Sequence, residues 1–396
     1  AVRSLSLRAG SGEIEALGTI LPSLSVAGLV SGLDLAEISS LWPPVPAGVL
    51  AGKLSMSFVG EGKWNSPVLS GDLSLEKGSV RGIPVDRARA WWRFAENRLT
   101  ASQAEGSVFS SPVRGTLSLL FTPGQAPFLE ASFSGESFGT GNAKRLFPAG
   151  SIEGVIDTFS GQVSGTADTL SGTAAIRARS LSLFGLAASN AELQAEFTPS
   201  AVKLKGKTGI VDGMADFSGT VENYATAPRL HLTAAIRSFS LQKAVSLVKD
   251  FTRTGLSGSV NADLVLKGSP LLPEISGKVW STRLTAGKEI LTSPSLSFSL
   301  KGGHAAISSA AAQWRGAGIT ASGSVTPGGK LDITVQANAI QPGKFSDLLP
   351  GIPAASFRGT LSAKAAVKGT TASPSISLVL SSPQLSLPGT LSLKNL

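Results

Sequence analysis

A unit of about a hundred residues recurs along this chain and limits how it can fold. Similar apolar segments open at glycines spaced 102, 104 and 101 residues apart: Gly52, Gly154, Gly258 and Gly359. In repeat proteins of this kind each unit packs mainly against its neighbours in the sequence. We expect repeats at 52–153, 154–257 and 258–358. Partial repeats are expected at 1–51 and 359–396, which favours a fragment of a longer protein.

A short helix is expected before each opening glycine. The four candidate segments are 34–43 (with the helix itself near 34–41), 140–148, 240–251 and 341–350. Asp34, Thr140 and Ser240 are suitable N-cap residues, because their side-chain oxygens can accept a hydrogen bond from a free backbone N–H. Trailing prolines would end such helices.

Between the helices, apolar and polar residues alternate. Leu54, Met56 and Phe58 fall on one side of a strand, and Ser55 and Ser57 fall on the other. The same alternation occurs at 193–197, 230–234, 296–300 and 331–335. Glycine-containing segments at 60–62, 122–124 and 327–329 predict turns. The pattern therefore predicts a mainly β protein with sequential antiparallel hairpins in one long sheet, about ten strands in each unit.

The apolar face of such a sheet must be hidden from water. One short helix per repeat cannot cover it, which leaves two arrangements. The sheet can curl into an elongated, taco-like groove, or its walls can meet and pack as an ordinary closed core. A long exposed apolar groove would be expected to hold a ligand.

The alternation also selects candidate lining residues for the groove. These are Leu54, Met56, Phe58, Leu73, Leu75, Leu264, Leu266, Leu296, Phe298 and Leu300. Ordinary core packing is the competing interpretation for each of them.

Catalytic, metal and cofactor chemistry is poorly supported. The chain has no cysteine, and its two histidines, His231 and His304, are far apart with no carboxylate cluster beside them. Segments 139–145 and 206–208 resemble parts of phosphate-binding loops, but they lack required glycines and are better interpreted as turns. We expect neither an enzyme nor a cofactor-binding protein.

The chain carries a formal charge of +9, but its Lys and Arg are scattered, so nucleic-acid binding is not expected. Trp91 and Trp92 stand among several arginines. They either pack within a strand or contact a lipid headgroup, since amphipathic rings prefer an interface.

Several phrases resemble the AsmA-like and TamB-like proteins of Gram-negative bacteria. The resemblance is strongest over 52–119, with GKWNSP from Gly62, VRGIPV from Val80 and RGTLSL from Arg114, and it extends across the chain. It implies a β-groove in the periplasm, tethered to the inner membrane by a segment outside this chain. Such a groove passes phospholipids between the inner and outer membranes, with membrane or envelope-assembly proteins as partners.

The expected function is therefore transfer of phospholipid acyl chains. The alternative is a scaffold or chaperone that assists assembly of outer-membrane β-barrels by β-augmentation, a role to which TamB relatives are linked. An adhesin with a closed core is a third possibility.

Overall fold

The computed structural model describes residues 4–20, 23–37, 50–80, 83–143, 152–183, 185–224, 226–245, 255–348, 358–382, 384–386 and 392–394. Over these ranges the chain is mainly β, with an antiparallel sheet of 24 strands, so the expected fold class is confirmed at this level. The contacts divide the chain into two units, Ala1–Val202 and Lys203–Leu396. Each unit is described separately below.

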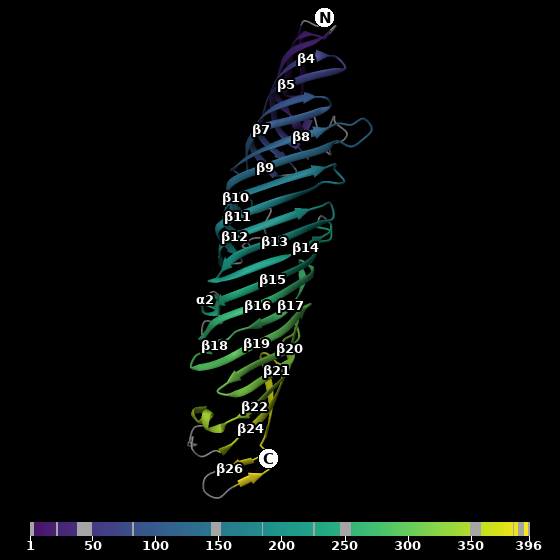
Figure 1. The fold of residues 1–396 in the computed structure, drawn as a ribbon. Coiled ribbons are helices and arrows are strands. Elements are labelled where there is room, and N and C mark those ends of the chain that lie inside the picture. The colour runs from purple at the N-terminus through teal and green to yellow at the C-terminus, as the bar shows by residue number, and fades with distance from the viewer. Residues whose placement is uncertain are drawn as a thin grey trace. The chain divides into compact units, whose positions relative to one another are not determined.

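In the first unit, every strand pairs antiparallel with the next one along the chain (Figure 1). The strands are β1 (Ser4–Ala9), β2 (Gly12–Thr19), β3 (Leu24–Asp34), β4 (Leu50–Lys63), β5 (Ser66–Val80), β6 (Ile83–Ala95), β7 (Arg98–Val108), β8 (Ser111–Leu120), β9 (Phe128–Gly139), β10 (Ile152–Gly165), β11 (Ser171–Leu183) and β12 (Leu186–Phe197). A 3-10 turn, η1 (Thr140–Ala143), follows β9. The sequential hairpins inferred from the alternation are thus present.

The second unit continues with the same kind of pairing. Its elements are β13 (Ala201–Ile210), which begins just before the boundary, β14 (Gly213–Glu222), β15 (Arg229–Ser240), α2 (Leu241–Val245), β16 (Leu256–Ser269), β17 (Leu272–Trp280), β18 (Arg283–Ala286), β19 (Glu289–Lys301), β20 (His304–Trp314), β21 (Ala317–Val325), β22 (Lys330–Ile340), η3 (Pro342–Leu348), β23 (Arg358–Gly359), β24 (Leu361–Thr370), β25 (Pro374–Ser381), β26 (Gln384–Ser386) and β27 (Ser392–Lys394). β17 and β18 together occupy one strand position between β16 and β19. β23, β26 and β27 form a separate small sheet.

The strands are fewer and longer than the sequence predicts. β4 and β5 run for 14 and 15 residues, and six described strands, β4 to β9, account for the stretch expected to hold about ten. The predicted turn at 60–62 is wrong, because these residues lie inside β4 and the chain turns at Trp64 and Asn65. A Cβ at Gly60 would lie 2.6 Å from a methyl carbon of Leu69, so this glycine marks a close side-chain approach.

Three other turn predictions have different outcomes. The turns predicted at 122–124 and 327–329 are present. The turn predicted at 206–208 is wrong, because these residues lie inside β13.

Helical turns occur at all four expected places within the described residues. They are residues 35–37, η1, α2 and η3, and each begins three positions after a residue with positive φ: Gly32, Ser137, Ser238 and Ala339. Asp34 Oδ1 accepts a hydrogen bond from the Ala36 N–H at 2.9 Å, as expected of an N-cap. The rest of the candidate helices, within 38–49, 144–151, 246–254 and 349–357, lies outside the described residues. None of the helices in the described ranges has the length and apolar character needed to cross a membrane.

Candidate functional site

The strand register of the first unit joins apolar side chains into rows on one face of the sheet. Directly opposed residues on neighbouring strands share a face. One row crosses eight strands, from β5 to β12: Gly71, Trp92, Ala101, Leu117, Ala131, Val163, Gly172 and Phe197. This face is called the apolar face of the unit.

The second unit has an apolar face built in the same way. Its central row runs from β14 to β25: Phe217, Ala234, Leu264, Gly277, Phe298, Ile307, Gly323, Ile333, Val367 and Ile376. The continuity depends on register, since a slip of one residue would turn each strand's apolar set to the other side.

All ten predicted lining residues lie on these apolar faces and are half-buried. In the first unit, Leu54 opposes Leu75 and Met56 opposes Leu73. In the second, Leu266 and Leu300 both oppose Ile275. Their role in binding a ligand stays a prediction.

Other members of the same faces were not predicted from the sequence. Val30 and Leu33 on β3 oppose Met56 and Leu54, and Phe94 on β6 opposes Leu69. Alternation in β3 and β6 could have found them. Bulges in both strands interrupt the period of two, which weakens that signal.

Several phenylalanine rings of the first unit occupy the space above glycines of adjacent strands. An ideal Cβ at Gly28 would lie 2.3 Å from Cζ of Phe58, and one at Gly161 would lie 2.4 Å from Cζ of Phe133. An ideal Cβ at Gly135 would lie 2.2 Å from Cζ of Phe159. The glycines therefore make room for these rings on the apolar face.

Burial on the apolar faces is uneven in the described part of the chain. A few large residues are buried, among them Val30 (5% exposed), Trp92 (7%) and Ile156 (7%). Most apolar-row residues are only half-buried. A closed core of two packed walls would bury many large apolar residues completely.

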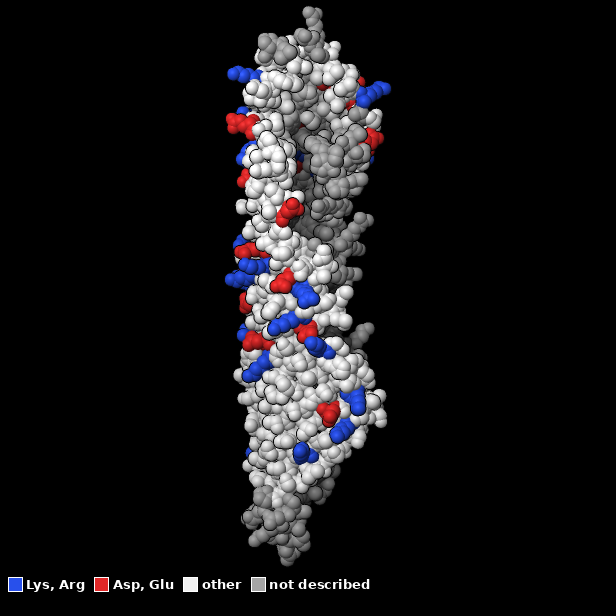
Figure 2. Space-filling model, turned by 90° about the vertical axis from the view of Figure 1, so that its right-hand side faces the viewer, with Lys and Arg blue, Asp and Glu red and all other residues white. Residues whose placement is uncertain are grey.

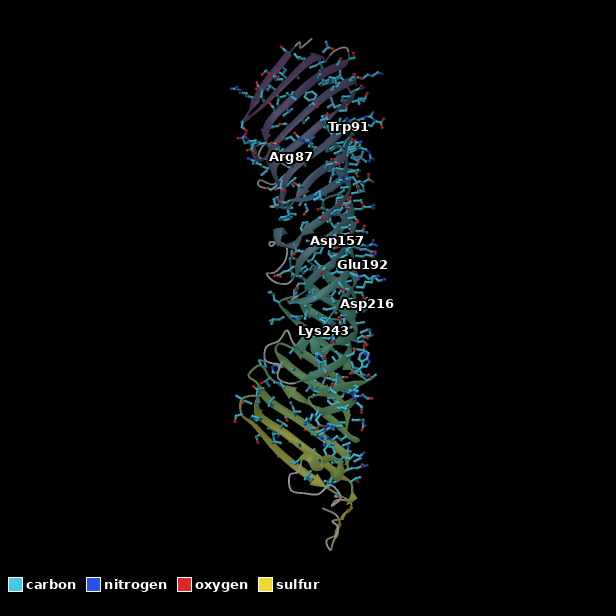
Figure 3. All side chains as sticks on the ribbon, turned by 90° about the vertical axis from the view of Figure 1, so that its left-hand side faces the viewer. Arg87, Trp91, Asp157, Glu192, Asp216 and Lys243 are labelled. Carbon is cyan, nitrogen blue, oxygen red and sulfur yellow. The ribbon has the colours of Figure 1, made fainter. Side chains whose placement is uncertain are left out.

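The opposite face of the first unit is polar. One row reads Ser74, Arg89, Glu105, Arg114, Ser134, Ser160, Ala175 and Gln194. Trp91 and Glu192 both stand out from this side of the sheet (Figure 3). In the space-filling view, charged side chains of the N-terminal part lie along both of its margins (Figure 2).

Charges on the polar face pair with one another. Arg114 Nε lies 3.4 Å from Glu105 Oε1, and Arg179 Nη2 lies 2.8 Å from Asp157 Oδ1. Hydrogen bonds from the Arg179 side chain and backbone hold the pKa of Asp157 below its usual value. The same Asp157 carboxylate raises the pKa of the Arg179 guanidinium.

The two adjacent tryptophans have different surroundings. Trp92 is buried on the apolar face, which matches the strand-packing interpretation. Trp91 is 41% exposed on the polar face and opposes Asp72 and Ser102. The two rings have different surroundings because a strand sends consecutive side chains to opposite sides.

The described residues contain no group of three or more His, Asp or Glu side chains arranged to hold a metal ion. His231 opposes Lys267 and Thr220, and His304 opposes Lys301, so the two histidines stand in separate polar positions.

No protein-family model, curated protein or solved structure matches this chain. The two faces of the sheet must therefore be interpreted from their own chemistry.

Proposed function

We propose that the sheet of each unit curls around its apolar face as a taco-like groove that holds lipid acyl chains. In this proposal the protein transfers phospholipids between the inner and outer membranes, in the periplasm. It is tethered to the inner membrane by a segment outside this chain. The resemblance to AsmA-like and TamB-like proteins supports the setting, and the apolar faces support the cargo.

One observation carries the proposal: continuous rows of apolar side chains are present, yet most members of these rows are only half-buried. A face of this kind is costly in water unless something covers it. Hydrocarbon chains would cover it without requiring any specific polar contact.

The energetics favour a continuous face. Each exposed CH₂ costs about 0.8 kcal/mol in water, so a chain of about sixteen carbons costs roughly 12 kcal/mol to expose. Rows of apolar residues repeat every ~4.8 Å from strand to strand, so a sliding chain would exchange one contact for an equivalent one.

The experiment compares matched substitutions on the two faces of one strand. Met56→Asp and Phe298→Asp place a charge on an apolar face, and Ser57→Asp and Ser297→Asp place it at the neighbouring position on the polar face. We expect the first pair to reduce transfer of fluorescent phospholipid between donor and acceptor vesicles at least tenfold, because a carboxylate would have to be desolvated against hydrocarbon. The second pair should transfer lipid as the parent protein does.

Circular dichroism and thermal unfolding identify variants that keep the fold. Folded apolar-face variants with undiminished transfer would contradict the proposal. So would purified protein from which mass spectrometry recovers no bound lipid.

One observation favours the scaffold alternative. β25 is exposed at every residue, including Ile376 (67%) and Val379 (65%). An exposed apolar strand can template another strand by β-augmentation. Binding of an unfolded barrel strand by lipid-free protein, abolished by Val379→Pro, would favour this role over lipid transfer.

A further inference from the structure

The polar face of the first unit carries adjoining shallow depressions that end at an exposed tryptophan. Their volumes are about 790, 630 and 560 Å³. The first two share Thr116, Ser132, Gln162 and Thr173, and the first and third share Gln103. Trp91 lines the third. We call this continuous surface the Trp91 lane.

A β-bulge shapes the lane beside Trp91. Between the pairs Arg89–Glu105 and Trp91–Ser102 the register shifts, so β7 has one extra residue. Gln103 takes a left-handed backbone at φ 51°, which is unusual for a residue other than glycine. The bulge brings two consecutive polar residues, Ser102 and Gln103, to the lane. Register shifts also occur in other strands of this sheet, and this one matters because of the two polar residues that it places beside Trp91.

The charge of the lane does not favour an anionic ligand. Five carboxylates line it (Asp72, Glu76, Glu105, Glu130 and Glu196) against three arginines. Arg114 is paired with Glu105, and Glu130 is paired with Arg98. The chain as a whole carries +9, but the lane offers no surplus of positive charge to a phosphate headgroup or an acidic polymer.

The remaining chemistry matches a neutral polyol. The floor offers Ser and Thr hydroxyls, such as Thr116 and Ser132 with their oxygens 2.8 Å apart, and Gln side chains that both donate and accept. The exposed indole of Trp91 presents a flat apolar surface on which the C–H face of a sugar ring can pack. We propose that the Trp91 lane binds a neutral saccharide chain, with Trp91 as the stacking platform and Gln103 as a hydrogen-bonding partner. This site is separate from the apolar face and does not depend on lipid transfer.

The test uses the full chain and three soluble neutral polysaccharides: dextran, laminarin and hydroxyethylcellulose. Affinity electrophoresis through gels that contain each probe should retard the parent protein with at least one of them. Trp91→Ala should weaken that binding about tenfold, since loss of a stacked ring is of the order of 1.4 kcal/mol. Gln103→Gly should also weaken it, and glycine tolerates the left-handed backbone at this position.

Trp64→Ala is the matched control, because Trp64 is 65% exposed in the same unit but lies in the turn after β4 and outside the lane. It should leave binding unchanged. Three results would each overturn the proposal: no retardation by any of the three probes, equal retardation of Trp91→Ala, or Trp91-dependent binding only to phosphatidylglycerol vesicles or polygalacturonate.

Discussion

Glu289 anchors the helical turn η3 to the sheet of the second unit, and its removal should cost measurable stability. Its carboxylate accepts hydrogen bonds from Trp314 Nε1 at 2.6 Å and Arg315 Nε at 2.8 Å, and it forms a further ion pair with Arg315 Nη2. Arg315 Nη1 in turn donates to the Lys344 carbonyl in η3 at 2.8 Å. The guanidinium also lies 5.5 Å from the ring centre of Phe345. The Glu289 carboxylate therefore orients Trp314 and Arg315, and Arg315 in turn holds η3.

The magnitude follows from the burial of this pair. The side chains of Arg315 and Glu289 are only 20% and 30% exposed, which places them between surface ion pairs and fully buried ones. Glu289→Ala removes the acceptor used by the Trp314 N–H and by the Nε and Nη2 groups of Arg315. We expect a loss of about 2–3 kcal/mol in the free energy of unfolding. In a unit of this size that corresponds to a fall in Tm of about 5–10 °C.

Urea unfolding followed by circular dichroism would measure the effect. Glu274→Ala is the control, because the Glu274–Lys301 pair spans a comparable 2.7 Å but its side chains are 47% and 75% exposed. That variant should lose less than about 0.5 kcal/mol. Equal losses in the two variants would refute the reasoning that burial sets the value of the Glu289 group. So would full additivity of Glu289→Ala and Arg315→Ala, since partners in one network should couple.

Two further predictions concern the first unit. Gly161→Ala should destabilise the protein by about 1–3 kcal/mol, because the new methyl would meet the ring of Phe133, whereas Gly141→Ala, with nothing within 4 Å of its Cβ, should be near neutral in the same urea titration. Comparable urea midpoints for Gly161→Ala and Gly141→Ala would contradict this prediction. The Asp157–Arg179 pair should stabilise the fold above the ordinary pKa of aspartate, about 4, and lose that contribution as pH falls through the lowered pKa of Asp157. The stability difference between the parent protein and Asp157→Asn, measured at pH 7 and pH 3, should therefore shrink at pH 3, and a constant difference would show that the pair does not contribute.

The sequence alone predicted the mainly β class and the antiparallel hairpins. It also predicted the apolar side of strands such as β4 and β19. These properties are local: alternation with a period of two selects a strand, and its apolar residues select the side that avoids water. Thr140 does not act as the expected N-cap, because it lies inside η1 and its hydroxyl donates to the Gly154 carbonyl.

Only the tertiary structure decided which residues meet across strands. Gly60 and Gly62 lie inside β4 instead of forming a turn, because whether a glycine bends the chain or makes room for a neighbour depends on the facing strand. The bulge at Gln103 could not be read from the sequence either, since it is defined by a mismatch in length between β6 and β7. That mismatch places Ser102 and Gln103 beside Trp91, while Trp92 packs among apolar partners on the other face. Alternation is a property of a single strand, whereas register is a property of a pair of strands. The sequence therefore determined which side chains share a face of each strand, and the fold determined which side chains meet on that face.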